Sequence, residues 1–300
     1  MSTTAYPDDL VADVVLRDGS TLRVRPVRPS DRPRLLAFLE ALSTESRVFR
    51  FFSSGASLER AADWAADVDY DDRFGLVATV GEQARIVGHA AYIRMGAGRA
   101  EIAFEVADDL HGRGIATILL AHLAAAAQQR DIGTFVALVL AENHRMLHVL
   151  RDSGFPLAFH TESGRLSVEM PTSLTPEARI RFEQRDRVAA AAAVARILAP
   201  ASVALIGASD REGTIGAAIT RNLLAGGFHG DVHLVNRRGG TLGARPLHRS
   251  VLDVPGPVEL AVVAVPARGV VSVARECARK GVRGVVVVSA GFAETGGDGA

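Results

Sequence analysis

The stretch Ala100–Ala116, AEIAFEVADDLHGRGIA, decides how the first half of the chain folds. Its opening residues alternate in polarity as a strand does, and a turn with two glycines then leads into an alanine-rich helix. The two-residue period of a strand places Glu101, Ala103 and Glu105 on one face. Glycines let a ligand approach the turn closely, and the start of a helix favours an anion such as a pyrophosphate. The segment therefore predicts carboxylates beside a phosphate-binding turn, which suits acyl-coenzyme A chemistry.

The same features also have plain structural explanations. A Gly-x-Gly turn occurs in many tight turns that bind nothing, and charges on a strand face commonly point to water. The surrounding pattern favours a site role for Glu101, whereas for Glu105 a solvated position is at least as good an explanation.

The turn His111–Ala116 resembles a motif of the GNAT acetyltransferases, Gln/Arg-x-x-Gly-x-Gly/Ala, which follows a central strand that carries a Glu base. Arg113, Gly114 and Ala116 fit that turn, and His111 stands where the family usually has Gln or Arg. This difference alters one side-chain contact and leaves the backbone cradle intact.

A second segment resembles the next motif of the same family, a helix that starts at Asn143 and ends in Gly154 and Phe155. Asparagine is also a good helix N-cap and glycine a common helix stop, so the structural and the ligand-binding explanations carry similar weight. Many family members place a Tyr four residues before the Gly as general acid. This chain has Leu150 there, which leaves the general acid unassigned.

The resemblance implies an N-terminal GNAT fold, a mixed central sheet flanked by helices, that uses acetyl-CoA as co-substrate and no metal. It implies that Glu101 is the general base for direct transfer, with Glu105 as a second choice. The residues expected to bind acetyl-CoA are Val106, His111, Gly112, Arg113, Gly114, Ile115, Ala116 and Asn143.

The run Leu42–Phe52 resembles the signature of one subgroup, the Pat-type protein lysine acetyltransferases. In that subgroup a GNAT domain is joined to an ADP-forming acyl-CoA synthetase-like domain. The resemblance implies a protein substrate with an acceptor lysine, namely an acyl-CoA synthetase of the AMP-forming type. We expect the three phenylalanines of the run to pack a helix against the sheet.

Composition fits two folded domains, since the 300 residues are 48% hydrophobic. Lys and Arg together number 34, as do Asp and Glu, and there is no basic tract, which argues against a nucleic acid or an anionic membrane as partner. The single cysteine, Cys277, fits a reducing cytoplasm and is expected to pack a helix rather than act as a nucleophile.

The second half reads as buried strands that alternate with helices, which predicts a parallel, Rossmann-like sheet with ligands at its carboxyl edge. The expected strands begin at Ser202 and cover Asp231–Val235, Glu259–Val265 and Gly284–Ser289. The turns that follow them resemble those of the CoA-binding domain of succinyl-CoA synthetase α subunits and ADP-forming acyl-CoA synthetases. Each turn alone is equally a plain β–α connection. Together they imply CoA or nucleotide binding at Gly207, Ser209, Gly213, Gly216, Asn236 and Ser289.

These patterns predict a GNAT domain over 15–171, a connector helix within 172–200 and a CoA-binding domain over 201–300. The sequence ends before the remaining strands, the phosphohistidine region and the ATP-grasp domain of the acyl-CoA synthetases. We therefore expect an incomplete second domain and no nucleotide-driven acyl-CoA synthesis. Whether the second domain regulates the first, is vestigial or belongs to a longer protein stays open.

The sequence as a whole predicts a cytoplasmic enzyme that transfers an acetyl group from acetyl-CoA to a lysine amine. Two alternatives remain: an acetyltransferase for small amines, and a non-catalytic acyl-CoA sensor. We further hypothesise that a ligand at the turn Gly207–Gly216 alters transferase activity through the connecting helix.

Overall fold

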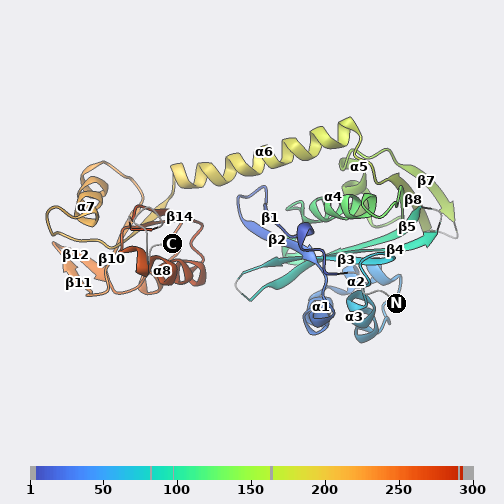
Figure 1. Cartoon of the computed structure of the whole chain (residues 1–300), viewed down its shortest axis with the longest axis horizontal. Coiled ribbons are helices and arrows are strands. Elements are labelled where there is room, and N and C mark those ends of the chain that lie inside the picture. Colours follow the sequence, from blue (N-terminus) through green and yellow to red (C-terminus); the bar gives the residue numbers. More distant parts are fainter. Residues whose placement is uncertain (1–4, 82, 97, 163–164, 290, 293–300) are drawn as a thin grey trace. The chain divides into compact units, whose positions relative to one another are not determined.

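The computed structural model describes residues 5–81, 83–96, 98–162, 165–289 and 291–292. The chain divides into two compact units, Met1–Ala190 and Ala191–Ala300. Figure 1 labels their helices and strands along the sequence. Of the helices that the structure describes, none has both the length and the hydrophobicity needed to cross a membrane.

The first unit is built on an eight-stranded sheet in the order β1-β2-β3-β4-β5-β6-β8-β7. Neighbouring strands are antiparallel except β5 and β6, which are parallel. This confirms the mixed sheet that the sequence predicted. The strands are β1 (Ala12–Val15), β2 (Thr21–Pro26), β3 (Arg73–Val80), β4 (Arg85–Gly96), β5 (Arg99–Val106), β6 (Thr134–Leu140), β7 (Ala158–Glu162) and β8 (Arg165–Pro171).

Helices cover both faces of this sheet, with α1 to α3 on one side and α4 and α5 on the other (Figure 1). The helices are α1 (Arg32–Ala41), α2 (Thr44–Phe51), α3 (Leu58–Ala66), α4 (Ile115–Gln128), α5 (His144–Asp152) and α6 (Pro176–Leu198). Short 3-10 turns are η1 (Asp8–Leu10), η2 (Pro29–Asp31) and η3 (Asp108–Leu110). The connector predicted from the sequence is α6, and its buried Ala178 and Phe182 belong to the core of the first unit.

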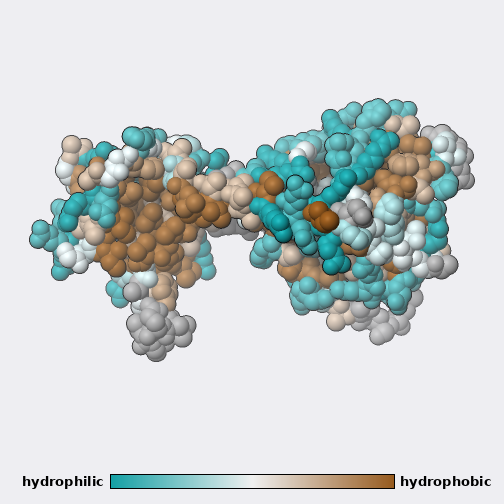
Figure 2. Space-filling model, turned by 90° about the horizontal axis from the view of Figure 1, so that it is seen from above, coloured by the Kyte–Doolittle hydropathy of each residue, from teal (hydrophilic) through white to brown (hydrophobic). Residues whose placement is uncertain are grey.

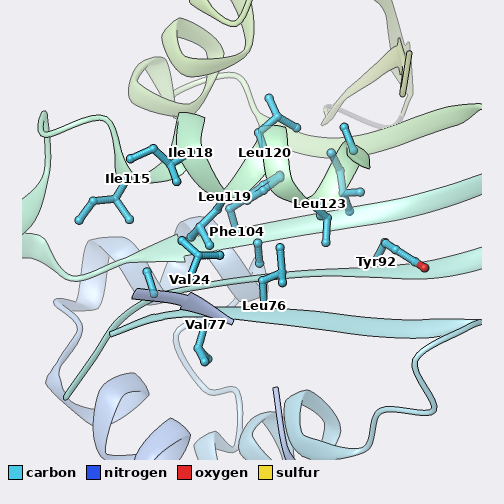
Figure 3. Packing of buried hydrophobic residues seen from close by; sticks show 14 of the residues in the cluster. Val24, Leu76, Val77, Tyr92, Phe104, Ile115, Ile118, Leu119, Leu120 and Leu123 are labelled. Atoms are coloured by element: carbon cyan, nitrogen blue, oxygen red, sulfur yellow. The ribbon is translucent and has the colours of Figure 1, made fainter. Parts of the chain in front are cut away.

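The core of the first unit includes buried residues of α1 and α3, and a large part of it lies between α4 and the sheet (Figure 3). Ile115, Leu119 and Leu123 of α4 point toward the strands that carry Leu76 and Phe104, and all five side chains are buried. Complete burial of an aliphatic side chain contributes about 2 kcal/mol. This packing fixes the start of α4 against the end of β5, which positions the glycine turn between them.

The parallel strands β5 and β6 pair only over their first halves. The paired residues run from Arg99 with Thr134 to Ile102 with Ala137, although β5 continues to Val106 and β6 to Leu140. Beyond Ile102 the two strands diverge and leave a wedge between their carboxyl ends.

The second unit contains a six-stranded sheet in the order β11-β12-β10-β9-β13-β14. Its strands are β9 (Ser202–Ile206), β10 (Asp231–Val235), β11 (Gly240–Leu242), β12 (Arg245–His248), β13 (Leu260–Val263) and β14 (Gly284–Val287), with helices α7 (Ile215–Ala225) and α8 (Ala267–Lys280) and the 3-10 turn η4 (Val251–Asp253). The four expected strands are confirmed and are parallel. The predicted parallel, Rossmann-like sheet is thus confirmed, and β11, which was not predicted, is added to it antiparallel to β12.

Hydrophobic side chains gather on part of the surface of the second unit (Figure 2). The exposed valines of this unit include Val285, Val286 and Val287 of β14. Cys277, by contrast, is buried on α8, and this burial raises the pKa of its thiol to about 11. The sulfur therefore stays a thiol at neutral pH, as the expected packing role requires.

Candidate functional site

A cavity of about 900 Å³ lies in the first unit, at the wedge between β5 and β6. Its walls also include residues of α2, α4, α5 and α6. The sequence-predicted site residues that line it are Glu101, Glu105, Val106, His111, Gly112, Gly114, Ile115, Ala116 and Asn143. Ten residues were predicted for this site, and the structure brings all of them except Arg113 to one cavity.

The glycine turn has the backbone conformation that the sequence suggested. Gly112 and Gly114 have φ of 76° and 84°, in the left-handed region where a side chain is strained. No atom lies within 4 Å of a Cβ added to either residue, so the backbone conformation and not crowding requires glycine. Gly114 is the N-cap of α4, and the first residues of this helix line the cavity. The N–H groups of a first helical turn have no partner within the helix. The turn can therefore hold an anion with backbone groups alone.

His111 is fully engaged within the protein. Arg145 Nη1 lies 3.1 Å from His111 Nδ1, and His111 Nε2 lies 2.9 Å from the carbonyl oxygen of Val106. Arginine can only donate, so Nδ1 accepts and Nε2 carries the proton that is donated to Val106. The imidazole thereby connects the glycine turn to the end of β5.

Arg113 lies outside the cavity lining. Its Nη1 donates to Asp18 Oδ2 at 2.8 Å, so the side chain is directed to the turn between β1 and β2. Asn143, in contrast, lines the cavity and caps α5, because its Oδ1 accepts from the backbone N–H of Met146 at 3.0 Å. The N-cap explanation for Asn143 is thus confirmed.

The two carboxylates of β5 lie in different surroundings. Glu101 is exposed on the cavity face. Glu105 is buried and accepts from Arg50 Nε at 2.7 Å, while its other oxygen lies 2.8 Å from His89 Nδ1. Burial raises the pKa of the Glu105 carboxyl, but the neighbouring Arg50 and His89 outweigh it and lower the pKa to about 2. Glu105 is therefore an ionised structural anchor at neutral pH.

Helix α2 forms one wall of the cavity with Ser46, Phe49 and Arg50, and its C-cap residue Phe52 also lines the cavity. No residue of this helix is buried. The expectation that its phenylalanines pack it against the sheet was thus wrong for Phe49 and Phe52, which line the cavity. Phe51 packs against the core of the first unit as expected, and polar contacts also hold the helix.

Those contacts are made at both ends of α2. At its start, the N–H and Oγ of Ser43 and the Oγ of Ser46 all donate to the Asp108 carboxylate, at 2.7–2.8 Å. At its end, Arg50 pairs with Glu105. Asp108 and Glu105 both belong to the segment that leads from β5 into the glycine turn, so this segment positions both the turn and α2.

Sequence reasoning missed the residues that line the cavity from α2 and α6, and the buried contact of His89 of β4 with Glu105. His89 and Arg50 meet Glu105 only through tertiary packing, and no local pattern signals that contact. A signal was present in α6, where Arg181, Arg185 and Val188 recur at helical spacing and all line the cavity.

In the second unit, the predicted ligand residues make contacts within the protein. A Cβ on Gly207 would come within 2.3 Å of the Ala264 carbonyl oxygen, and one on Gly216 within 2.1 Å of the Gly207 carbonyl oxygen. Both glycines therefore permit close approach of backbones at the ends of β9 and β13.

The three polar residues predicted for the second unit also have partners. Asn236 Nδ2 donates to the Ala208 carbonyl oxygen at 2.8 Å, and Ser209 Oγ accepts from the Arg211 N–H at 3.0 Å. Ser289 Oγ lies 3.5 Å from the Val263 carbonyl oxygen. Ser209 also lines a cavity of about 420 Å³ beside α7, while Gly213 has open space around it at φ 76°.

No group of three or more His, Cys, Asp or Glu side chains that could hold a metal ion occurs among the described residues of either unit.

Comparisons with known proteins assign both units to families. Residues 21–156 match the acetyltransferase (GNAT) domain, and residues 201–296 match the CoA binding domain.

Individual relatives agree with both assignments. The chain is 39% identical to the crystal structure of the GNAT domain of S. lividans PAT, with a TM-score of 0.52 over 56% of this chain and 99% of that one. It is 34% identical over 139 residues to acetyltransferase Pat of Mycolicibacterium smegmatis, which covers 46% of this chain and 42% of that protein. Over 104 residues it is 43% identical to the α subunit of ADP-forming acetate–CoA ligase I of Pyrococcus furiosus, covering 33% of this chain and 22% of the subunit. The chain therefore spans less than half the length of both full-length relatives.

Proposed function

Because the chain belongs to the GNAT acetyltransferases and joins that domain to a CoA-binding domain of the ADP-forming acyl-CoA ligase type, we propose that it transfers an acetyl group from acetyl-CoA to a protein lysine. The observation that carries this proposal is the cavity at the β5–β6 wedge, which combines an exposed carboxylate with a glycine turn at a helix start. The similarity to Pat supports a protein as acceptor, and an AMP-forming acyl-CoA synthetase is the target we propose.

The glycine turn would hold the pyrophosphate of acetyl-CoA. Its backbone N–H groups and the dipole of α4 supply the positive end that an anion needs. The pantetheine arm would then follow the unpaired edge of β5 near Glu105 and Val106. This places the thioester beside the strand face that carries Glu101.

Glu101 is the general base we propose, directly or through water. A lysine amine with a pKa of about 10.4 is protonated at pH 7, and removing its proton costs roughly 4 to 5 kcal/mol. Glu105 is less suited to this role, because its pKa of about 2 makes it a weak base and both of its oxygens are engaged. Once deprotonated, the amine attacks the thioester carbonyl and the C–S bond breaks in a direct transfer. CoA leaves as a thiolate that takes a proton from water, and the attacking nitrogen loses its second proton to water.

Measuring acetyl-CoA-dependent release of CoA tests the proposal, with an AMP-forming acetyl-CoA synthetase as acceptor. We expect Glu101→Gln to reduce turnover by about 10²- to 10⁴-fold while acetyl-CoA binding is retained. Glu40→Gln is the matched control, since Glu40 is exposed on α1 and outside the cavity lining.

Three results would contradict parts of the proposal. Equal turnover of Glu101→Gln and wild type would reject the assigned base. Turnover on free amines but on no protein would make the enzyme a small-molecule acetyltransferase. Acetyl-CoA binding without turnover on any acceptor would make the chain a sensor.

For the second unit we propose binding of CoA or a nucleotide at the carboxyl ends of β9 and β10. The match to the CoA binding domain supports this. A cytoplasmic location remains our proposal on the evidence of the single, buried cysteine.

A further inference from the structure

Arg185 of α6 places a buried guanidinium in the wall of the first unit's cavity. Its side chain is 10% exposed, and its Nη1 is buried without a hydrogen-bond partner among the described residues. Nη2 lies 2.8 Å from Oδ1 of Asp186, the next residue along the chain. One edge of the guanidinium is therefore paired and the other is not.

This arrangement is unfavourable for a group with only a structural role. A buried donor without a partner loses its bonds to water and regains nothing. The carboxylate of Asp186 is 64% exposed, so water screens much of its charge. The unpaired edge of Arg185 thus calls for an anion that the described part of the chain does not supply.

Further cationic side chains line the same cavity as Arg185. Arg145 and Arg181 also line the cavity, and the Arg181 guanidinium donates to a backbone carbonyl, not to a carboxylate. His122 of α4 lies near enough to feel the charge: burial and, after it, Arg185 both lower the pKa of its imidazole. Asp152 is the acidic lining residue on α5.

We propose that Arg185 binds a phosphate group of acyl-CoA, so that helix α6 forms part of the acyl-CoA site. This inference rests on the proposed function, since it assumes acyl-CoA in this cavity. A guanidinium presents paired N–H donors that match two phosphate oxygens, and such bonds are among the strong ones in proteins. The unpaired Nη1 is the donor that phosphate would take up.

Acyl-CoA offers two phosphate sources, the pyrophosphate and the 3′-phosphate of its ribose. His122, beside Arg185, lies seven residues beyond the start of α4 at Ile115, which corresponds to about 10 Å along the helix. The glycine turn at that start is where we place the pyrophosphate. Both phosphates remain candidates for Arg185, and the experiment below separates them.

Helix α6 also extends into the second unit. Residues up to Ala190 of α6 belong to the first unit and the following residues, to Leu198, belong to the second. A ligand that engages Arg185 thus contacts a helix whose residues are divided between the two units.

The test is calorimetric titration of the full chain with CoA and, separately, with 3′-dephospho-CoA. Wild type is compared with Arg185→Gln, Arg185→Lys and the control Arg187→Gln. Arg187 is an exposed arginine on the same helix and outside the cavity lining. Gly114→Asp puts a carboxylate into the glycine turn of the first unit. The CoA binding that this variant loses is the part that the first unit contributes. Thermal melting without ligand shows that each variant is folded.

We expect Arg185→Gln to weaken CoA binding in the first unit about tenfold to a hundredfold. Arg185→Lys should restore only part of the lost CoA affinity, because lysine keeps the positive charge but lacks the paired N–H donors of the guanidinium. If the 3′-phosphate is the partner, Arg185→Gln weakens CoA and leaves dephospho-CoA unchanged. If it is the pyrophosphate, both ligands weaken equally.

Two results would overturn the inference in distinguishable ways. Arg185→Gln and Arg187→Gln with the same CoA affinity as wild type would reject a phosphate contact while leaving the proposed function intact. CoA binding by wild type that Gly114→Asp does not diminish would reject acyl-CoA use by this cavity, and with it both proposals.

Discussion

Arg50 donates from Nε to Oε2 of Glu105 at 2.7 Å, and this ion pair fastens a helix that has no buried residue to the strand at the centre of the cavity. The side chains of Arg50 and Glu105 are 16% and 5% exposed. Arg50 and Glu105 therefore form a largely buried ion pair and not a surface salt bridge.

Removal of the Glu105 charge should destabilise the first unit strongly. Loss of one partner of a buried ion pair costs about 3 to 5 kcal/mol, because the other charge stays buried without compensation. We expect Glu105→Gln to lower the free energy of unfolding by that amount in urea titration. Glu101→Gln, at an exposed position of the same strand, should change it by no more than about 0.5 kcal/mol. A similar small effect of both variants would show that the pair is not a stabilising tie.

The same carboxylate should make stability sensitive to acid. Its pKa is 4.5 in the ordinary state and about 2 in the folded protein, so the folded state binds the proton more weakly than the unfolded state. The contribution of Glu105 is fully present above pH 4.5 and is lost as the pH falls from about 4.5 through 2. The difference in unfolding free energy between wild type and Glu105→Gln should therefore narrow across that range. A constant difference would assign the acid sensitivity to other groups.

We propose that α2 is the cavity wall that contacts the acceptor, so the Asp108 contacts should matter for the acceptor more than for acetyl-CoA. Asp108→Asn removes the negative charge that three donors of Ser43 and Ser46 share, and so loosens the start of α2. We expect the KM for the acceptor protein to rise about fivefold, the equivalent of about 1 kcal/mol, with a smaller change for acetyl-CoA. Asp109→Asn is the control, since Asp109 pairs only with the exposed Arg85 among described side chains. Equal effects on both substrates would argue against a specific role of α2 in acceptor binding.

Gly114 should be required for its backbone conformation. Gly114→Ala forces a side chain into φ 84°, which costs about 1 kcal/mol and shifts the first N–H groups of α4. Gly256→Ala imposes a similar strain at φ 71° in open space in the second unit. Calorimetry should show weaker CoA binding by the first unit in Gly114→Ala alone, whereas both variants should lose stability. Unchanged CoA affinity in Gly114→Ala would move the phosphate site away from the turn.

Control by the second unit can be tested at Gly213. The structure rules out Gly207 for this purpose, because any side chain there meets the Ala264 carbonyl oxygen. Gly213→Asp puts a negative charge at the same turn in open space and should weaken binding of CoA or a nucleotide to the second unit. If that ligand tunes the transferase, acetyl-CoA saturation curves measured with the ligand present will shift. Gly243→Asp, in the β11–β12 hairpin, is the control, and identical curves for all three proteins would reject regulation through this turn.

The sequence was sufficient for features that depend on local pattern. The alternation in Arg99–Val106 and the glycines after it predicted a strand, a turn and a helix, and the structure has all three. The connector helix was predicted within 172–200 and runs from Pro176 to Leu198. The strands β11 and β12 escaped prediction because they are short and contain Gly240 and Pro246, which disfavour strands.

Features that depend on distant contacts were not predictable from one sequence. Glu105 looked as suited to solvent as to a site, and only the fold reveals that His89 of β4 and Arg50 of α2 enclose it. Arg113 matched a family motif, yet its side chain reaches Asp18. Side-chain direction in a turn follows from its neighbours in space, which the spacing of a motif does not record.

The wedge between β5 and β6 also has an evolutionary consequence. Where β5 and β6 stop pairing, their backbone N–H and C=O groups are available to another extended segment, as in β-augmentation. In the proposed complex, the amides of the pantetheine arm would pair with these groups in place of a strand. Such recognition would use main-chain groups, which a change of side chain along the strand leaves in place. Phe49 and Phe52 line the same cavity with side chains, which substitution can change without altering this backbone edge.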